Sequence, residues 1–427
     1  MITWTTLDQI LLPLTKRSPL QQGWSPQCES QPAEKGAWGV LKTTAIQAGK
    51  FEENANKRLP ETLKPRPELE VVSGDLLITC AGPRARCGVP TLVRKSRPGL
   101  LLSGKMYRFR TIPDVDPRFL EYYLLSSSAQ AEIDKMKTGI NESGLNLTKS
   151  RFLALPVPIA PLAEQRRIVE ILEDHLSRID AAMGYLHASI RRCSHLIESW
   201  LRDSLQPVAG ENRRLADLIV ESRGGWSRSR GHLVAKTEGT PYLKMNNIAR
   251  TGDLVLDDVV NVVATEADLS KYQIRSGDVL FNSKNSGDLI GKAAVADQRV
   301  AGWVFNENIM RLRFDDVVSP EYAGLWFLGR QARTQIRKNA SASTNVAAVY
   351  FRALKDFEMW VPGMDVQERL VAEYLERRSA ADRLRNEVEA QLRSSERLRH
   401  SILVAAFSGK LTDSALDVER VEEMAGV

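Results

Sequence analysis

Basic and amide side chains lie in polar loops along this 427-residue sequence, where they could contact bases and phosphates of a duplex. Arginine forks onto guanine, asparagine pairs with an adenine edge, and lysine suits phosphate oxygens. On this chemistry Arg84 and Arg86 are candidates for contact with guanine edges. On the same chemistry Asn246, Asn247 and Asn285 suit adenine, Lys42, Lys244, Lys284 and Lys292 suit phosphates, and the remaining candidates are Thr43, Thr44, Asn141, Ser343 and Asn345. A loop asparagine is also a common turn residue, so these assignments have a structural alternative.

The sequence lacks the motifs of a catalytic or metal site. It contains no GxGxxG or GxxxxGK[ST] loop, and residues 408–410, Ser-Gly-Lys, read as a turn that ends a helix. The four cysteines form no CxxC pair and the five histidines no HxxxH or HExxH, which argues against zinc. The Asn-Pro-Pro-Tyr type of motif that holds a flipped base is also missing. We expect no catalysis by this chain.

Two long helices must position these loops. Residues 161–205 place apolar side chains at steps of three and four along a charged stretch, and Gly184 is its one internal glycine. Residues 365–411 repeat this design. About 40 helical residues at ~1.5 Å each give roughly 60 Å, which exceeds the usual helix of a compact domain. We predict that the two helices are partners.

An internal duplication accounts for several matches in register. Gln165 and Gln367 are 202 positions apart, and the Ser-Gly-Asp turns that end at Asp75 and Asp278 are 203 apart. A Val-Pro pair precedes each long helix, at residues 157–158 and 361–362. Any one match is explained by a common turn, but the shared order favours a repeat. The frameworks repeat while the loops differ, as expected of two modules that read different sequences.

Local patterns predict the elements around these loops. Residues 69–80 read as a strand pair around the first Ser-Gly-Asp turn, residues 100–110 as one strand, and residues 117–137 as helical. No apolar run reaches the roughly 20 residues of a membrane span, and the first residues lack a basic segment before their short apolar run. We expect a cytoplasmic protein.

The net charge of +6 is unevenly distributed. Residues 1–160 hold 22 Lys and Arg against 15 Asp and Glu, and residues 211–364 hold 21 against 18. The helical stretches 161–210 and 365–427 are slightly acidic, with 6 basic residues against 7 acidic and 10 against 13. A positive excess in the two globular parts suits contact with phosphates, although an excess of this size also occurs in proteins that never bind nucleic acid.

Three short motifs mark the long helices: Pro-Leu-Ala-Glu-Gln-Arg-Arg-Ile-Val at residues 161–169, Val-Gln-Glu-Arg-Leu-Val at 366–371 and Ala-Phe-Ser-Gly-Lys-Leu at 406–411. Together with the repeat, these motifs resemble the specificity subunit of Type I restriction-modification enzymes. The sequence departs from the family at Val366, where Glu is common, and at residues 204–207, a weak echo of the second helix ending. The resemblance spans nearly the whole chain.

The resemblance implies an α+β fold in which two globular α/β target-recognition domains are separated by two long antiparallel coiled-coil helices. The corresponding segments are residues 1–160 and 208–364 for the domains, 161–207 and 365–411 for the helices, and 412–427 for a C-terminal tail. The resemblance further implies double-stranded DNA with a split target, two methyltransferase subunits and motor-nuclease subunits as partners. S-adenosylmethionine, and ATP with magnesium, are then expected in those partners and not in this chain.

Two alternatives stay open. The chain could be a coiled-coil adaptor that binds proteins only, which predicts no salt-sensitive binding of duplex DNA. It could also be the recognition arm of an enzyme whose methyltransferase is normally fused, which predicts activity with one large partner.

Overall fold

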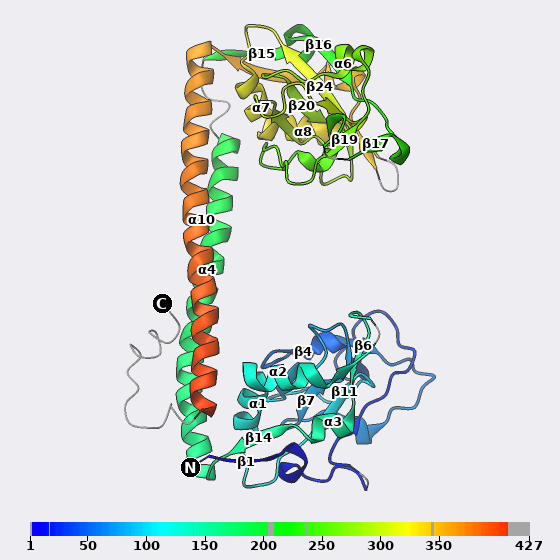
Figure 1. Cartoon of the computed structure of the whole chain (residues 1–427), viewed down its shortest axis with the longest axis vertical. Coiled ribbons are helices and arrows are strands. Elements are labelled where there is room, and N and C mark those ends of the chain that lie inside the picture. Colours follow the sequence, from blue (N-terminus) through cyan, green and yellow to red (C-terminus); the bar gives the residue numbers. More distant parts are fainter. Residues whose placement is uncertain are drawn as a thin grey trace. The chain divides into compact units, whose positions relative to one another are not determined.

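The structure is a computed structural model that describes residues 2–16, 18–139, 141–203, 209–235, 237–342 and 346–408. It divides into two compact units (Figure 1). Unit 1 comprises residues 1–187 and 389–427, and unit 2 comprises residues 188–388. Helices α4 (Leu162–Asp203) and α10 (Met364–Phe407) each contribute a segment to both units. These are the two long helices predicted from the apolar spacing, and the structure confirms them.

Unit 1 contains a mixed α/β domain built on small sheets. Its central antiparallel sheet has the order β2-β11-β7-β9, formed by Gln21–Gln22, Met106–Phe109, Leu76–Thr79 and Pro90–Leu92. A second sheet has the order β10-β3-β6, formed by Leu100–Leu101, Gly39–Leu41 and Asn56–Arg58. Strands β1 (Thr3–Thr6) and β14 (Pro156–Ile159) pair, as do β4 (Ile46–Gln47) and β5 (Lys50–Phe51). Its helices are α1 (Pro117–Leu125), α2 (Ser127–Met136) and α3 (Lys149–Leu153), with short 3-10 turns at Leu7–Ile10, Thr43–Ala45 and Pro67–Leu69.

Unit 2 repeats this plan. Its central sheet has the order β16-β24-β20-β22, formed by Ile219–Gly224, Ile309–Phe314, Val279–Asn282 and Ala293–Val295. The second sheet, β17-β19-β18-β23, is formed by Leu233–Val234, Val260–Val262, Thr240–Leu243 and Val304–Phe305. Strands β15 (Gly210–Arg214) and β27 (Glu358–Pro362) pair. The helices are α5 (Leu215–Leu218), α6 (Glu266–Tyr272), α7 (Pro320–Leu328), α8 (Arg330–Asn339) and α9 (Phe351–Leu354), with 3-10 turns at Arg230–His232 and Met245–Asn247.

The strand register confirms the duplication. Met106 pairs with Thr79 between β11 and β7, and Ile309 pairs with Asn282 between β24 and β20. Both members of the second pair lie 203 positions after their counterparts in the first. The Ser-Gly-Asp turns precede β7 and β20, and Gly74 and Gly277 adopt φ values of 90° and 89° there. Glycine suits these turns because a Cβ disfavours positive φ.

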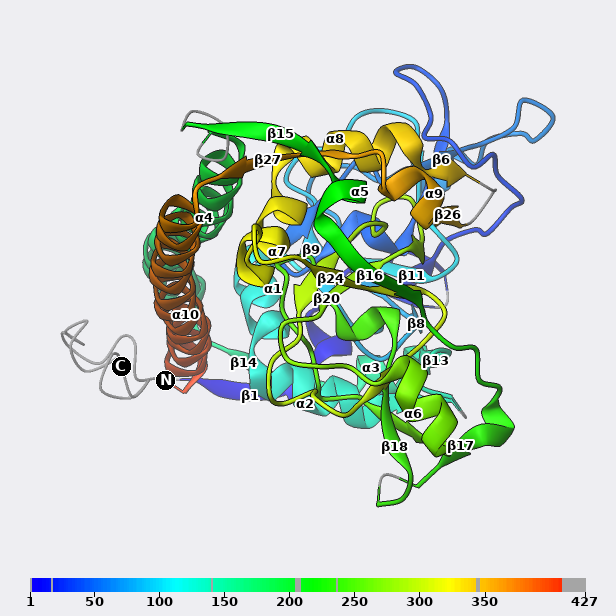
Figure 2. The same cartoon turned by 90° about the horizontal axis from the view of Figure 1, so that it is seen from above.

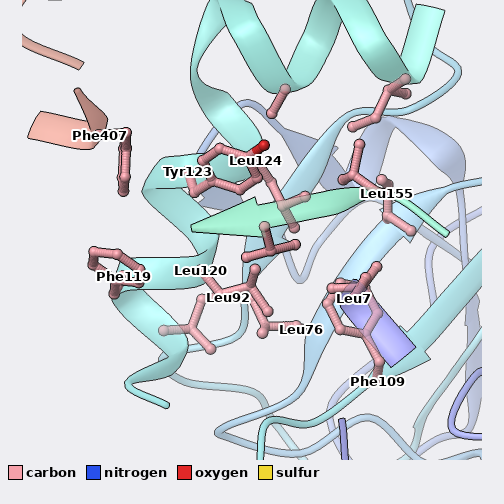
Figure 3. Packing of buried hydrophobic residues seen from close by; sticks show 14 of the residues in the cluster. Leu7, Leu76, Leu92, Phe109, Phe119, Leu120, Tyr123, Leu124, Leu155 and Phe407 are labelled. Atoms are coloured by element: carbon pink, nitrogen blue, oxygen red, sulfur yellow. The ribbon is translucent and has the colours of Figure 1, made fainter. Parts of the chain in front are cut away.

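The long helices are held to the domains by hydrophobic packing within each unit. In unit 1, Phe407 of α10 packs edge-on against Phe119 and Tyr123 of α1, at centroid distances of 5.2 and 5.4 Å (Figure 3). In unit 2, Trp200 of α4 stacks on Tyr374 of α10 at 5.9 Å. Helix α7 lies between α10 and strands β20 and β24 (Figure 2). Burial of aromatic rings contributes about 1.5–3 kcal/mol each, so these contacts fix the helix segments firmly.

Three local predictions need correction. The residues before the first Ser-Gly-Asp turn do not pair with β7, because Val71 donates its N–H to Leu100 and the turn is closed by Asp75. Residues 100–110 form two strands, β10 and β11, since a turn at Ser103 separates them. Residues 117–137 form two helices because Ser126 is extended and caps α2 with its hydroxyl.

Candidate nucleic-acid interface

In unit 1 the sheet β12-β13-β8 brings two of the predicted loops together. Strand β13 (Leu145–Leu147) pairs with β12 (Lys137–Thr138) on one side and with β8 (Ala81–Gly82) on the other. The loop after β8 carries Arg84 and Arg86, and the connection between β12 and β13 carries Asn141. Arg84 donates its N–H to the Glu142 carbonyl at 3.0 Å, which joins the two loops directly.

Arg84 is exposed, but its guanidinium is already paired. Its Nε lies 2.7 Å from Glu142 Oε2, and its Nη1 lies 2.6 Å from Asp134 Oδ2. The hydrogen bond from Arg84 lowers the pKa of Glu142 below its usual value, and a hydrogen bond from Lys137 lowers the pKa of Asp134. Because both carboxylates stay ionised, the predicted guanine contact of Arg84 would require it to leave two partners.

Arg86 joins this surface to a third loop. Its Nη1 donates to the Ile46 carbonyl and to Gln47 Oε1, each at 3.3 Å. Gln47 in turn donates to the Thr44 carbonyl at 2.8 Å, at the 3-10 turn that follows Lys42. The structure therefore collects all six candidates of unit 1 on three adjoining loops, namely Lys42, Thr43, Thr44, Arg84, Arg86 and Asn141.

Unit 2 assembles its candidate loops in the same way. Strand β26 (Ala347–Ala348) pairs with β21 (Lys284–Asn285) and with β25 (Ser341–Ala342), as β13 does with β8 and β12. The Lys292 ammonium donates to the carbonyl of Met245 at 2.8 Å and to the carbonyl of Ile248. This links the loop after β21 to the 3-10 turn at Met245–Asn247.

Three of the predicted contacts in unit 2 are at odds with the structure. The Asn247 side chain is 1% exposed. Its amide oxygen accepts a hydrogen bond from the N–H of Lys244, and its amide nitrogen donates to the carbonyls of Val255 and Asp258. Lys292 is 6% exposed, and burial lowers its pKa. The buried Asn285 accepts a hydrogen bond from the backbone N–H of Ser286. Buried polar groups are normally hydrogen-bonded within the protein. The hydrogen bonds of these side chains therefore stabilise the loops.

The remaining candidates of unit 2 differ in burial. Asn246 is exposed, and Lys244 and Lys284 are half-buried, so their side chains reach the surface beside the buried set. Ser343 and Asn345 lie outside the described residues.

Helix α8 carries three arginines that were not among the predicted site residues, namely Arg330, Arg333 and Arg337. Their spacing of three and four residues was a detectable signal, because such positions share one face of a helix. In the part of the chain that the structure describes, no group of three or more His, Cys, Asp or Glu side chains could hold a metal ion. No described helix is long and apolar enough to span a membrane.

Comparisons with known proteins agree with this architecture. A family model described as the Type I restriction modification DNA specificity domain matches residues 48–184. The specificity subunit of the Type I restriction enzyme EcoEI from Escherichia coli is 34% identical over 198 residues, which cover 46% of this chain and 32% of that protein. The EcoKI specificity subunit from Escherichia coli strain K12 is 22% identical over 309 residues, 69% of this chain and 65% of that one. The matches thus span about one third and two thirds of these relatives.

Solved structures share the fold. One, described as the structural basis underlying complex assembly and conformational transition of the type I R-M system, superposes with a TM-score of 0.74 at 19% identity over 96% of this chain and 98% of that one. The HsdS subunit from Thermoanaerobacter tengcongensis gives 0.51 at 20% identity, with 96% and 97% covered. Both curated relatives are named specificity subunits of Type I restriction enzymes. Residues 48–184 thus match the DNA specificity domain of Type I restriction-modification systems, and the chain as a whole is similar to their specificity subunits.

Proposed function

We propose that this chain recognises a bipartite DNA target for a Type I restriction-modification complex, with one domain for each half-site. The observation that carries the proposal is the matched loop assembly of the two units. Strands β8, β13 and β12 in unit 1 and β21, β26 and β25 in unit 2 hold equivalent loops on equivalent frameworks. The side chains on these loops differ, with Arg84 and Arg86 in one unit and Lys284 in the other. Equal frameworks with different loops suit the reading of two different sequences.

The recognition domains in this proposal are residues 1–160 and 208–364, and the helices at 161–207 and 365–411 carry the partner subunits. Large apolar side chains on the described helices support a protein interface. Tyr185 and Leu196 of α4 are 73% and 69% exposed, and Leu375 and Leu384 of α10 are also exposed. Covering such side chains with a partner would remove their apolar surface from water, which favours association.

We further propose that the partners are two methyltransferase subunits, joined by restriction and translocase subunits, and that the complex works in the cytoplasm. S-adenosylmethionine, and ATP with magnesium, then belong to those subunits. This chain contributes recognition and scaffolding and performs no catalytic step of its own.

Methylation sequencing tests the proposal in cells that carry this chain and its neighbouring methyltransferase. We expect a split adenine-methylated motif that disappears when the chain is deleted. Exchange of residues 83–88, the loop of Arg84 and Arg86, for alanine and glycine should alter one half of the motif, and exchange of residues 284–288 should alter the other half. The control is Lys338→Gln, an exposed lysine of α8 that lies outside both exchanged segments. An unchanged methylome on deletion, together with no salt-sensitive binding of duplex DNA, would favour a protein-only adaptor.

A further inference from the structure

A cavity of about 860 Å³ lies within unit 2, between α8 and the segments of α4 and α10 that belong to the same unit. Apolar side chains form part of its wall, among them Leu328, Ile336 and Tyr374. Ligand pockets usually measure about 300–1,000 Å³ and combine such apolar walls with a few polar groups. The cavity is therefore large enough for a small ligand and too small for a duplex to enter whole.

Positive charge dominates the lining of this cavity. Seven arginines line it, against Glu198, Asp288 and Asp382. Arg378 forms an ion pair with Asp253, and Arg385 lies 3.8 Å from Asp382. In the described part of the chain, no ion pair with a carboxylate is formed by the other five. Four of these lie around α8, namely Arg250, Arg330, Arg333 and Arg337, and the fifth is Arg202 of α4. The carboxylates of the lining therefore neutralise only part of the positive charge of its arginines.

The half-buried Arg333 shows the imbalance most clearly. Its Nη1 donates to the Ile290 carbonyl at 3.2 Å, which is a neutral partner. Burial lowers the pKa of Arg333, and the nearby guanidinium groups of Arg250 and Arg337 lower that pKa further. Like charges held this close without a carboxylate are unfavourable, and a bound anion would relieve the repulsion.

Helix α8 directs charge toward one place. Arg330, Arg333 and Arg337 are spaced by three and four residues, so they lie on one face of this ten-residue helix. The helix begins after Gly329, which provides no side-chain cap. The backbone N–H groups of the first turn and the positive end of the helix dipole add to the charge of Arg330.

We propose that this cavity is a phosphate-binding site, in which Arg330, Arg333 and Arg337 bind a multiply charged phosphate group. A carboxylate would bring one negative charge to a cluster of four unpaired guanidinium groups. A phosphate brings more charge and three acceptor oxygens, which match the forked donors of several arginines. The phosphate could come from a DNA backbone that passes the rim, which rests on the proposed function, or from a free polyphosphate.

Calorimetric titration of the full chain with inorganic triphosphate, at constant ionic strength, tests the site directly. We expect binding by the wild type and by the control Lys338→Gln, whose exposed side chain lies on α8 but does not line the cavity. The double variant Arg330→Gln, Arg337→Gln should bind about tenfold more weakly or worse, because it loses charge-assisted hydrogen bonds. Both side chains are exposed, so the fold should persist, and Arg333→Gln gives a second, independent variant.

Duplex binding across a salt series then separates the two sources. If a backbone phosphate enters the cavity, the double variant lowers the slope of log affinity against log salt by about 2, at ~0.9 per lost contact, and triphosphate competes with DNA. If the slope is unchanged while triphosphate still binds, the ligand is a free polyphosphate, and the site stands.

Three results would overturn the site. One is a chain that binds DNA but shows neither triphosphate binding nor a change of slope in the double variant. Another is equal triphosphate affinity in the wild type and both variants. The third is arginine-dependent binding of hexaglutamate without binding of triphosphate, which would assign the cavity to an acidic polypeptide. If the proposed function were wrong, the chain would bind no duplex at all. The titration with triphosphate does not depend on that result, so the two failures can be told apart.

Discussion

Gln165 and Gln367 make the same set of hydrogen bonds at the starts of α4 and α10. Both side chains are 0% exposed. Gln165 accepts a hydrogen bond from the N–H of Asp116 at 2.9 Å and donates to the carbonyls of Asp114 and Ala160 at 3.0 and 2.8 Å. Each amide thus connects the first turn of a long helix to the residues before a helix of the domain.

The second glutamine repeats the arrangement in unit 2. Gln367 accepts from the N–H of Ser319 at 2.9 Å and donates to the carbonyls of Val317 and Pro362 at 2.8 and 2.9 Å. Asp116 and Ser319 are also the N-caps of α1 and α7. In each unit one amide therefore connects the start of a long helix to its domain.

We predict that Gln165→Ala and Gln367→Ala each lower the free energy of unfolding by about 3 kcal/mol, because each leaves buried backbone groups without partners. Urea denaturation of the full chain measures the effect. Gln391→Ala, at an exposed position of α10, is the matched control and should change stability by less than about 0.5 kcal/mol. Equal stability of all three variants would contradict a structural role for the buried amides.

Asp75 is a second buried polar element. Its carboxylate accepts a hydrogen bond from Val72 N at 2.9 Å and lies 2.7 Å from Arg110 Nε and 3.3 Å from Arg108 Nη1. Asp75→Ala should cost about 3–5 kcal/mol, since it leaves the buried Arg108 without its countercharge. Thermal unfolding measures this loss, and Asp8→Ala, an exposed position in the same unit, is the comparison. A loss of stability as small as that of the control would show that the ion pairs of Asp75 contribute little to the fold.

Glu121 predicts a pH dependence of stability. The carboxyl is buried, and burial raises its pKa although Arg94 lies 2.8 Å away. A raised pKa in the folded state means that the folded chain binds the proton more tightly than the unfolded chain. The stabilising contribution is therefore complete below the unfolded pKa of about 4.3, and it is lost as pH rises through the folded pKa.

Relative to Glu121→Gln, the wild type should become less stable as pH rises across this window and then keep a constant difference. The measurement is urea denaturation at a series of pH values from about 4 upward. Glu61→Gln, whose side chain is 89% exposed, should run parallel to the wild type. A wild type that gains stability over Glu121→Gln in this window would show that the pairing with Arg94 outweighs burial.

Lys284 and Arg84 should respond differently to alanine. Arg84 is neutralised by Asp134 and Glu142, whereas Lys284 has no ion pair in the described part of the chain. Lys284→Ala should therefore lower the slope of log affinity for duplex DNA against log salt by about 0.9, the value of one phosphate contact. Arg84→Ala should change that slope less, because the positive charge of Arg84 is already neutralised by two carboxylates. Filter binding or fluorescence anisotropy across a salt series measures both, and a larger effect of Arg84→Ala would reverse the assignment.

Gly291 is a test of backbone geometry beside the loop of Lys284. Its φ is 73°, and a Cβ there would lie 2.6 Å from Ile336 Cδ1. Gly291→Ala should destabilise unit 2 by more than about 1 kcal/mol, because strain at positive φ adds to the steric contact. Gly287→Ala is the control, since nothing lies within 4 Å of its Cβ position. Similar melting temperatures for both variants would contradict this account.

The sequence by itself determined the large features of this protein. Apolar residues at steps of three and four specify α4 and α10 because that spacing forms one buried stripe on a helix. Matches at offsets of 202 and 203 reveal the duplication, since the same framework needs Gln165 and Gln367, and Asp75 and Asp278, at equivalent places. The sequence also predicted that many basic residues lie in surface loops, because polar segments between predicted strands are normally exposed.

Only the tertiary structure decided which loop side chains are available. Asn247 and Lys292 look like surface residues in the sequence, yet backbone carbonyls from distant loops surround them. Arg84 looks free, but its two carboxylate partners come from α2 and from the connection after β12. The arginines of α8 form a cluster with Arg250 only after the chain has folded. Burial and charge pairing arise from contacts between residues far apart in sequence, which local residue patterns do not specify.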